Sequence, residues 1–336
     1  MAREPVPAPS PGAPSDVPDF DPGPLLRQPD IQTILTALGR FPECPGVPEP
    51  LTVPVDDQGR AVRVLVDRPG TDPARGSLLL VHGLAGSANS SYMCWTAHEA
   101  LSRGWVVARM ILRGCGGTIG LSRSLHNAAQ SDDVERVLGA LDAHHLPRPF
   151  AVIGFSLGAS LALRAAALAG DTCGADIVAA VNPPVDLARC ARALERPRNL
   201  HYRAYFMIRL CRLLEESRRV IDIPGPRARP WRVSSIRQFD DLYTAPLAGF
   251  RDALDYYARS SAGPVLGRIR RPTLILCSRD DPLIPVESFD GIPERRGPVL
   301  CRLLSHGGHV GFRQRGERKF WAAPTVLDWI EAAGGR

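Results

Sequence analysis

The stretch from residue 150 to residue 168 limits the fold of this chain more than any other. Four apolar residues at 150–153 lead into Gly154-Phe155-Ser156-Leu157-Gly158, and a helix-forming run follows as far as residue 168. This order predicts a buried strand, one sharp turn with Ser156 at its apex, and a helix, the arrangement called a nucleophile elbow. The glycines indicate that backbone segments approach too closely there for a Cβ atom. We expect a strained backbone at Ser156 that lifts its hydroxyl clear of the sheet.

The overall composition is typical of a soluble globular protein. Of the 336 residues, 44% are hydrophobic and 23% are charged, which suits one α/β domain with an insertion. The net charge of +6 comes almost wholly from arginine, because Lys319 is the only lysine. The arginines are spread along the chain and no RNA- or DNA-binding motif accompanies them, so we expect no nucleic-acid partner.

Cysteine spacing and the N-terminal sequence indicate a cytoplasmic protein. The eight cysteines form no C-x-x-C pair and no regular framework, so we expect reduced, mostly buried thiols. Residues 1–22 are rich in proline and alanine and have no apolar stretch, which predicts a disordered segment and no signal peptide. No apolar run is long enough to predict a membrane span, and the dispersed cysteines and histidines predict no metal site.

Strand-like and helix-like segments alternate on both sides of the turn at Ser156. The strand-like runs lie at 61–66, 77–82, 105–111, 150–153, 177–181, 273–277 and 299–304, and the helix-like runs at 30–35, 91–103, 128–144, 157–168 and 320–333. Strands that are apolar throughout and joined by helices predict an α/β fold, with a mostly parallel central sheet and helices on both of its faces. The run at 61–66 alternates in polarity and predicts an antiparallel strand.

The alternation fails between residues 185 and 266, where we expect a helical cap inserted over the active face of the sheet. A basic amphipathic helix is predicted at 199–220 and a second helix at 243–259. The basic helix is more typical of a solvated cap face than of a membrane surface, and a peripheral membrane contact through the cap is the alternative. The predicted organisation is a disordered segment at 1–22, a core formed by 23–184 and 267–336, and the cap at 185–266.

Two later strands end in loops that supply what a reactive serine needs. A serine hydroxyl is too weakly acidic to attack alone, so it needs a base, and the base needs an orienting acid. In a parallel sheet, reacting groups lie in loops after the carboxyl ends of strands. We predict Ser156 as the nucleophile and His309 as the base, because glycines flank His309 whereas His306 belongs to the strand end. The predicted acid is Asp281, immediately before a proline, and Asp280 is the fallback.

A serine that attacks a carbonyl group also needs two backbone N–H donors for the oxyanion that forms. We predict the amides of Leu157, the residue after the nucleophile, and of Leu84, in the loop after the strand at 77–82. Neighbouring residues are expected to be structural: His82 as a loop histidine, Cys115 as a packing thiol, and Arg113 as a residue that holds its glycine-rich loop by hydrogen bonds.

Six short motifs follow one another in an order that resembles a known family. They are Asp30-Ile31-Gln32-Thr33-Ile34, His82-Gly83-Leu84-Ala85-Gly86-Ser87, Arg113-Gly114-Cys115-Gly116-Gly117, Gly154-Phe155-Ser156-Leu157-Gly158, Asp280-Asp281-Pro282 and Gly307-Gly308-His309-Val310-Gly311-Phe312. Through them, residues 25–334 resemble the α/β-hydrolase superfamily, and more narrowly its YheT-like branch (the AB hydrolase-4 family). The resemblance implies an α/β-hydrolase fold and a serine hydrolase acting, without a cofactor, on carboxylic esters of short to medium acyl chain or on lipids. Ala159-Ser160 departs from the Gly-Asn expected after the elbow.

The predicted reaction is a two-step acyl transfer in which Ser156 forms an acyl-enzyme and water releases the acyl group. An acyltransferase that passes the acyl group to another alcohol would use the same three side chains, so the sequence leaves this alternative open. A non-catalytic binding module with a hydrolase fold is the other alternative. Such modules usually lose a member of the triad, whereas all three positions are filled here.

Overall fold

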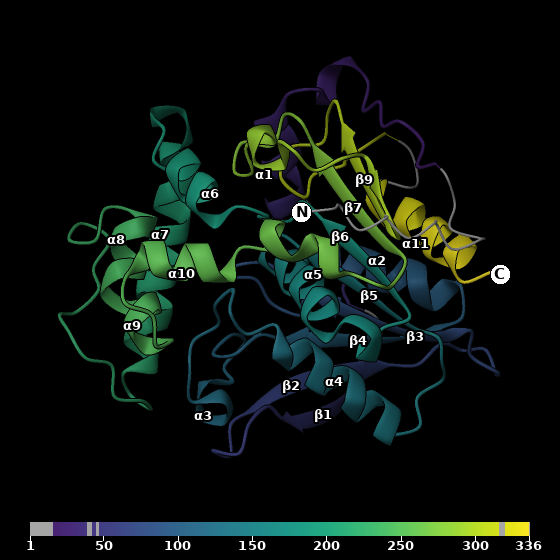
Figure 1. Cartoon of the computed structure of the whole chain (residues 1–336), viewed down its shortest axis with the longest axis horizontal. Coiled ribbons are helices and arrows are strands. Elements are labelled where there is room, and N and C mark those ends of the chain that lie inside the picture. The colour runs from purple at the N-terminus through teal and green to yellow at the C-terminus, as the bar shows by residue number, and fades with distance from the viewer. Residues whose placement is uncertain (1–15, 39–41, 45–46, 316–319, 336) are drawn as a thin grey trace, which may run out of the picture.

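A twisted sheet runs through the centre of the molecule (Figure 1). The computed structural model describes residues 16–38, 42–44, 47–315 and 320–335. In these residues the strands pair in the order β1-β2-β4-β3-β5-β6-β7-β9-β8. Their bounds are β1 (Glu49–Pro54), β2 (Ala61–Asp67), β3 (Gly76–Val81), β4 (Trp105–Ile111), β5 (Phe150–Phe155), β6 (Ile177–Val181), β7 (Thr273–Ser278), β8 (Arg295–Arg296) and β9 (Val299–Leu304).

The middle of the sheet is parallel and its edges are antiparallel. Each neighbouring pair from β4 through β3, β5, β6 and β7 to β9 is parallel. The edge strands β1, β2 and β8 pair in the antiparallel sense. All residues of β3, β5, β6 and β7 are buried, because other elements cover both faces of the sheet. The predicted α/β fold is confirmed, and β2 is the antiparallel strand expected at 61–66.

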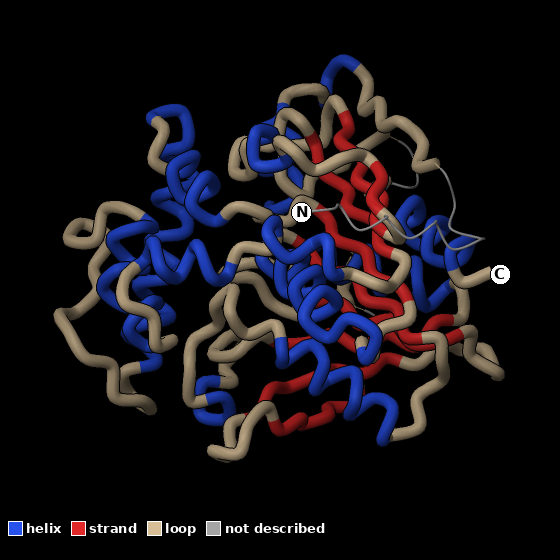
Figure 2. Tube along the Cα trace, in the orientation of Figure 1, coloured by secondary structure: helices blue, strands red, loops and turns tan. Residues whose placement is uncertain are grey.

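Helices pack on both faces of the sheet (Figure 2). Side chains of α2 and α11 belong to one hydrophobic cluster, and those of α4 and α5 belong to another on the opposite face. The helices outside the cap are α1 (Pro29–Leu38), α2 (Ser91–Ser102), α3 (Ile119–Ser122), α4 (Asp132–Ala143), α5 (Leu157–Ala169) and α11 (Ala322–Ala333), with short 3₁₀ turns η1 (Pro24–Leu26), η2 (Gly170–Thr172) and η6 (Val286–Phe289). The parallel strands and the two helical layers leave the carboxyl ends of the strands free at one edge.

The cap segment is helical and lies beside the sheet, on the left of Figure 1. It contains η3 (Pro197–Asn199), η5 (Gly263–Arg268), the π-helical turn η4 (Asp240–Thr244) and the α-helices α6 (Leu187–Leu194), α7 (Leu200–Ser217), α8 (Ile236–Phe239), α9 (Ala245–Leu247) and α10 (Ala253–Ser260). The prediction of a single helix at 243–259 is wrong. Pro246 and Gly249, which adopts φ +77°, divide that region into η4, α9 and α10.

The cap helix α7 corresponds to the basic amphipathic helix predicted at 199–220, and it ends at Ser217. Its buried side includes Met207, Leu210 and Leu214. Leu200 and Ile208 on the same helix are exposed, and the peripheral membrane contact stays a prediction. No helix in the described ranges is both long enough and apolar enough to cross a bilayer.

Part of the N-terminal segment packs against the core, which corrects the disorder expected through residue 22. Val17 and Phe20 are buried, and the Phe20 ring lies 5.6 Å from the ring of Phe312 and 5.0 Å from that of Trp321. These two apolar residues anchor a segment whose proline content otherwise favours disorder. Residues 1–15, the rest of the expected disordered segment, lie outside the described residues.

The cysteine prediction is also wrong in one respect. Cys44 and Cys94 form a disulfide that joins the segment before β1 to helix α2. The partners are 50 residues apart in the chain, so no local spacing indicates that they meet. The other six cysteines are free and buried, as expected. The cytoplasmic location predicted from reduced cysteines loses this support.

Candidate active site

The turn between β5 and α5 has the backbone expected of a nucleophile elbow. A Cβ atom on Gly154 would collide with the backbone of Gly158, and one on Gly158 would collide with the backbone of Val81 in the neighbouring strand β3. Ser156 adopts φ 52° and ψ −120°, a conformation that non-glycine residues rarely adopt. The predictions that both glycines permit close backbone approach and that Ser156 is strained are therefore confirmed.

Three side chains from separate strand ends meet at this turn. Ser156 follows β5, Asp281 follows β7 and His309 follows β9. Ser156 Oγ lies 2.9 Å from His309 Nε2, and His309 Nδ1 lies 2.9 Å from Asp281 Oδ2. With the Nδ1–H tautomer of His309, the imidazole donates to the carboxylate and accepts from the serine hydroxyl. This arrangement can move a proton from Ser156 Oγ to His309 Nε2.

The carboxylate of Asp281 is fully buried and is held by several donors. The amides of Leu283 and Ile284 donate to Oδ1 at 2.8 Å and 3.0 Å. Asn182 Nδ2 donates to Oδ2 at 2.6 Å and also to the carbonyl oxygen of Gly308 at 3.1 Å. These bonds satisfy a buried carboxylate and fix it against the imidazole of His309.

Asn182 is a residue of the site that the sequence reasoning missed. It follows β6, is fully buried and has φ 49°, and it joins the loop of Asp281 to the loop of His309. The only sequence signal is its position, directly after an apolar strand and before two prolines. That signal indicates a strand end at the edge of the sheet where reacting groups lie.

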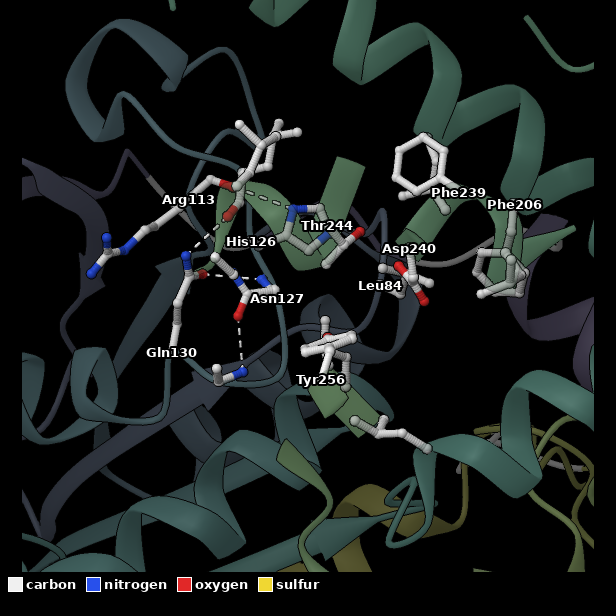
Figure 3. A pocket seen from close by; sticks show the side chains of 18 of the residues that line it. Leu84, Arg113, His126, Asn127, Gln130, Phe206, Phe239, Asp240, Thr244 and Tyr256 are labelled. Atoms are coloured by element: carbon white, nitrogen blue, oxygen red, sulfur yellow. Dashed lines mark hydrogen bonds between the residues drawn. The ribbon is translucent and has the colours of Figure 1, made fainter. Parts of the chain in front are cut away.

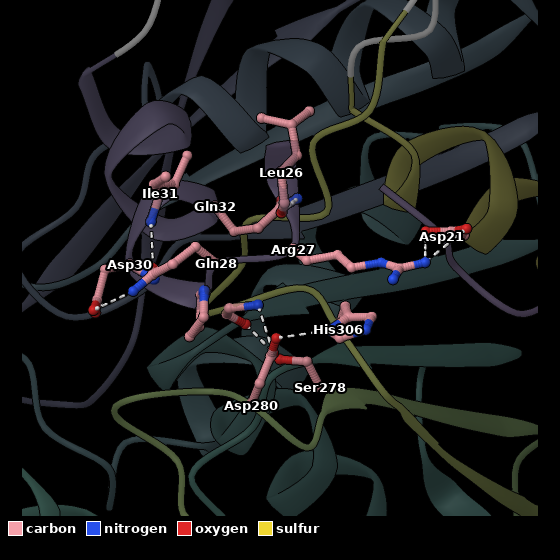
Figure 4. Close-up of polar contacts among 12 residues, drawn as sticks. Asp21, Leu26, Arg27, Gln28, Asp30, Ile31, Gln32, Ser278, Asp280 and His306 are labelled. Carbon is pink, nitrogen blue, oxygen red and sulfur yellow. Dashed lines mark hydrogen bonds and ion pairs between the residues drawn. The ribbon is translucent and has the colours of Figure 1, made fainter. Parts of the chain in front are cut away.

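Asp280, the fallback acid, contacts a different histidine (Figure 4). Its Oδ1 accepts the amide of Gly308 at 2.9 Å, and its Oδ2 lies 3.4 Å from His306 Nδ1. The structure therefore brings Asp281, and not Asp280, to His309. Asp280 and His306 instead hold the loop in which His309 lies.

Helix α1 supports the same loop from the N-terminal side, which gives the motif at residues 30–34 a physical role. Thr33 Oγ1 accepts the amide of His309 at 2.9 Å, and Gln32 Oε1 accepts that of Arg313 at 2.6 Å. A Cβ atom on Gly308, whose φ is +58°, would collide with the backbone of Pro29. The close approach of α1 thus requires a glycine before His309 and fixes the imidazole from behind.

The loop after β3 lies directly against the serine. A Cβ atom on Gly83 would be 3.0 Å from Ser156 Cβ. The backbone of Gly83, the residue before Leu84, is therefore in close contact with the nucleophile. His82 in the same loop is fully buried, and its Nε2 accepts the amide of Leu112 at 3.2 Å. Burial lowers the pKa of His82 to about 4, since desolvation disfavours the imidazolium. This neutral, hydrogen-bonded ring fits the structural role expected of it.

The side chain of Arg113 joins the glycine-rich loop at 113–117 to helix α4. Arg113 Nε donates to Asp133 Oδ2 at 2.7 Å, and both partners are buried. Burial raises the pKa of the Cys115 thiol to about 12, so the thiolate is scarce at neutral pH. Arg113 and Cys115 therefore have the structural roles that we expected.

A cavity of about 480 Å³ lies between the core and the cap and is lined by Ser156 and His309. Figure 3 shows Leu84 together with Phe206, Phe239 and Tyr256 of the cap around this space. The size and the mainly apolar lining are typical of a site for a small organic molecule.

The fold and the elbow define an α/β-hydrolase. A family model described as alpha/beta hydrolase fold matches residues 76–315, and the chain belongs to this family. Within it, the chain is 32% identical over 271 residues to the protein named "Putative esterase YheT" of Escherichia coli (strain K12). That match covers 79% of this chain and 79% of YheT, and it confirms the resemblance to the YheT-like branch.

More distant similarities agree with this family. The chain is 28% identical over 269 residues to "Monoacylglycerol lipase" of Saccharomyces cerevisiae, a match that covers 76% of this chain but only 59% of the yeast protein. Among solved structures, Est1E from Butyrivibrio proteoclasticus superposes with a TM-score of 0.55 at 12% identity, covering 85% of this chain and 99% of Est1E, which shows the fold alone. By homology the protein is an α/β-hydrolase of the esterase and lipase type.

Proposed function

We propose that the protein is a serine hydrolase that cleaves carboxylic esters of short to medium acyl chain, or lipids, through an acyl-enzyme on Ser156. The observation that carries this proposal is the chain of hydrogen-bond distances from Ser156 through His309 to Asp281, in the wall of a largely apolar cavity. A serine, a histidine and a buried carboxylate in this order perform acyl transfer on several unrelated folds.

In the proposed mechanism, His309 Nε2 takes the proton of Ser156 as Oγ attacks the ester carbonyl carbon. The carbonyl π electrons move to its oxygen and form a tetrahedral oxyanion. The oxyanion collapses, the bond to the alcohol breaks, and His309 gives its proton to the departing oxygen. Water then attacks the acyl carbon while His309 takes its proton, the bond from the acyl carbon to Ser156 Oγ breaks, and His309 returns the proton to Oγ as the acid leaves. Throughout, Asp281 keeps the proton of His309 on Nδ1 and stabilises the imidazolium.

The oxyanion is assigned to the backbone amides of Leu84 and Leu157. In the described part of the chain, the Leu84 amide has no hydrogen-bond partner. Leu157 is the first residue of α5, where amides have no acceptor within the helix and the helix dipole favours negative charge. Two such donors beside Ser156 can stabilise the charge that develops during attack.

The volume and lining of the cavity support the proposed class of substrate. A volume of about 480 Å³ lies within the range of sites that enclose small organic molecules. The largely apolar lining favours an ester with an alkyl acyl chain.

A series of p-nitrophenyl esters from acetate to dodecanoate tests the proposal on the full chain. We expect hydrolysis with the largest kcat/KM at short to medium acyl chains, and covalent labelling of Ser156 by a fluorophosphonate. Absence of both hydrolysis and labelling would overturn the proposal. Ethanol added to the assay separates the two acyl acceptors, because ethyl ester instead of free acid would identify an acyltransferase.

One cap residue is expected to affect the rate through the loop that contains Leu84. Arg209 of α7 donates from Nε and Nη2 to the carbonyl oxygen of Ala85, at 3.1 Å and 2.7 Å. Ala85 itself has φ 54°. We expect Arg209→Gln to lower kcat about tenfold with little change in KM, because a loosened loop misplaces an oxyanion donor. Steady-state kinetics on p-nitrophenyl butyrate measure this.

Arg212 provides the matched control for this prediction. It lies on the same helix, and its exposed guanidinium bonds only to Glu216 within the described residues. Arg212→Gln should therefore leave kcat unchanged. Arg209→Lys, whose ammonium group can still donate to the carbonyl oxygen of Ala85, should have a kcat between those of the wild type and Arg209→Gln. Equal kcat values for the Arg209 and Arg212 variants would contradict a role of Arg209 in positioning the loop.

A further inference from the structure

The cap places a buried carboxyl group in the wall of the cavity that also contains Ser156. Asp240, the first residue of η4, is 8% exposed and lines this cavity together with Thr244 (Figure 3). The phenolic hydroxyl of Tyr257 donates to Asp240 Oδ2 at 2.6 Å, and the Thr244 side chain lies close to the carboxyl group. No arginine, lysine or histidine of the described ranges forms an ion pair with it.

A buried aspartate without a cation is unusual, because such carboxyl groups are almost always paired. Burial raises the pKa of Asp240 to about 6, since desolvation outweighs the stabilisation of the carboxylate by Thr244 and Tyr257. At neutral pH the group is therefore mainly a carboxylate, with about four acceptor positions. The Tyr257 hydroxyl fills only part of this capacity. The carboxylate can accept another hydrogen bond from a molecule in the cavity.

The charges around the cavity indicate what kind of donor fits. Arg60, Arg113 and Arg123 also line it, and the acidic residues that line it in the described part of the chain are Asp222 and Asp240. A positively charged ligand would meet the guanidinium group of Arg123, since Arg60 and Arg113 are already ion-paired with Asp56 and Asp133. A neutral hydroxyl group meets no such repulsion and can donate to Asp240.

We propose that Asp240 accepts a hydrogen bond from a hydroxyl group of the substrate and makes the enzyme prefer hydroxylated esters over esters of similar size without a free hydroxyl. The inference rests on the proposed ester hydrolysis at Ser156 and deepens it. The hydroxyl can belong to the alcohol part, as in a glycerol ester, or to the acyl part. The hydrogen bond from Tyr257 fixes the position of the carboxylate in the cavity wall.

Three esters of similar size test the inference: propyl octanoate, monooctanoylglycerol and the propyl ester of ω-hydroxyoctanoic acid. For the wild type, we expect kcat/KM for one hydroxylated ester to exceed that for propyl octanoate by about 10- to 100-fold. The ester that shows the preference identifies the part that reaches Asp240. Asp240→Ala should bring the ratio close to one. Asp240→Asn should give an intermediate ratio, because a neutral acceptor is weaker than a carboxylate.

Asp241→Asn is the matched control for charge. Asp241 neighbours Asp240, does not line the cavity, and accepts the amide of Ala253 through Oδ1 at 2.7 Å, a bond that asparagine keeps. This variant should retain the full preference for the hydroxylated ester. Thermal unfolding of each variant identifies loss of folding, and Asp240→Asn, the nearest in shape, gives the decisive ratio if Asp240→Ala does not fold.

Three results would overturn the inference. They are equal kcat/KM for all three esters in the wild type, a preference that persists in both Asp240 variants, and a larger, Asp240-dependent preference for octanoylcholine, which would indicate a cation site. Hydrolysis of propyl octanoate, an ester without a free hydroxyl group, distinguishes failure of this inference from failure of the proposed function. If that ester is cleaved, only the role of Asp240 fails. If no ester is cleaved and Ser156 is not labelled, the proposed function fails as well.

Discussion

Replacing Ser156 with alanine is expected to lower kcat on p-nitrophenyl butyrate about 10⁴- to 10⁶-fold. The variant keeps the cavity and His309 but lacks the oxygen that attacks the carbonyl carbon. Any rate that remains would come from water held near the oxyanion donors. Stopped assays over hours, with protein made in parallel with the wild type, measure a rate this low. The same variant should lose all labelling by a fluorophosphonate.

Ser160 is the matched control, because it lies one turn later in the same helix. Its Oγ donates to the carbonyl oxygen of Pro184 at 3.3 Å and has no contact with His309. Ser160→Ala should retain kcat within about fivefold, since it removes one weak hydrogen bond. Unchanged hydrolysis by the Ser156→Ala variant would contradict the acyl-enzyme mechanism and favour another nucleophile. Unlabelled and inactive wild type would favour a non-catalytic binding module.

The meeting of Ser156, Asp281 and His309 could be anticipated from sequence because all three follow apolar runs. Such runs predict buried parallel strands, and parallel strands bring their carboxyl ends to one edge. The observed neighbours β5, β6, β7 and β9 have this arrangement. The elbow was predictable from its glycines for a similar reason, since close backbone contact excludes a Cβ atom whatever the rest of the fold is.

Residues that act through long-range contacts could not be predicted in this way. Asn182 joins two loops whose separation depends on how three strands pack. Asp240 lies in a π-helical turn, which no periodicity predicts, and the role proposed for it depends on how the cap meets the core. Cys44 and Cys94 meet only because a segment before β1 returns to α2. For Asn182 and for the two cysteines, the partner lies far away in the chain and no local pattern encodes the contact.

The choice between adjacent acids also depends on tertiary structure. Asp280 and Asp281 are chemically identical neighbours that point in different directions, one toward His306 and the other toward His309. The proline after Asp281 favoured it in the sequence, but only the hydrogen bonds distinguish the two carboxylates. Substituting each of the two aspartates in turn therefore tests which one orients His309.

Asp281→Asn is expected to lower kcat about 10⁴-fold, whereas Asp280→Asn should lower it less than about tenfold. The amide of asparagine would donate to His309 Nδ1, which places the ring proton on Nε2 and prevents this atom from accepting the proton of Ser156. In the Asp280→Asn variant, Oδ1 can still accept the Gly308 amide, so the loop of His309 keeps its position. Steady-state kinetics on p-nitrophenyl butyrate compare the two variants.

The folding of the Asp281→Asn variant has to be measured together with its kinetics, because the substitution disrupts a buried hydrogen bond. A new amide group there would face Asn182 Nδ2, which now donates to Asp281 Oδ2 at 2.6 Å, and two donors would then oppose each other. We expect a lower midpoint of thermal unfolding but a folded protein at assay temperature. If the folded Asp281→Asn variant keeps wild-type kcat while Asp280→Asn loses it, the orienting acid is Asp280, and the hydrogen bond between Asp281 and His309 has no part in the reaction.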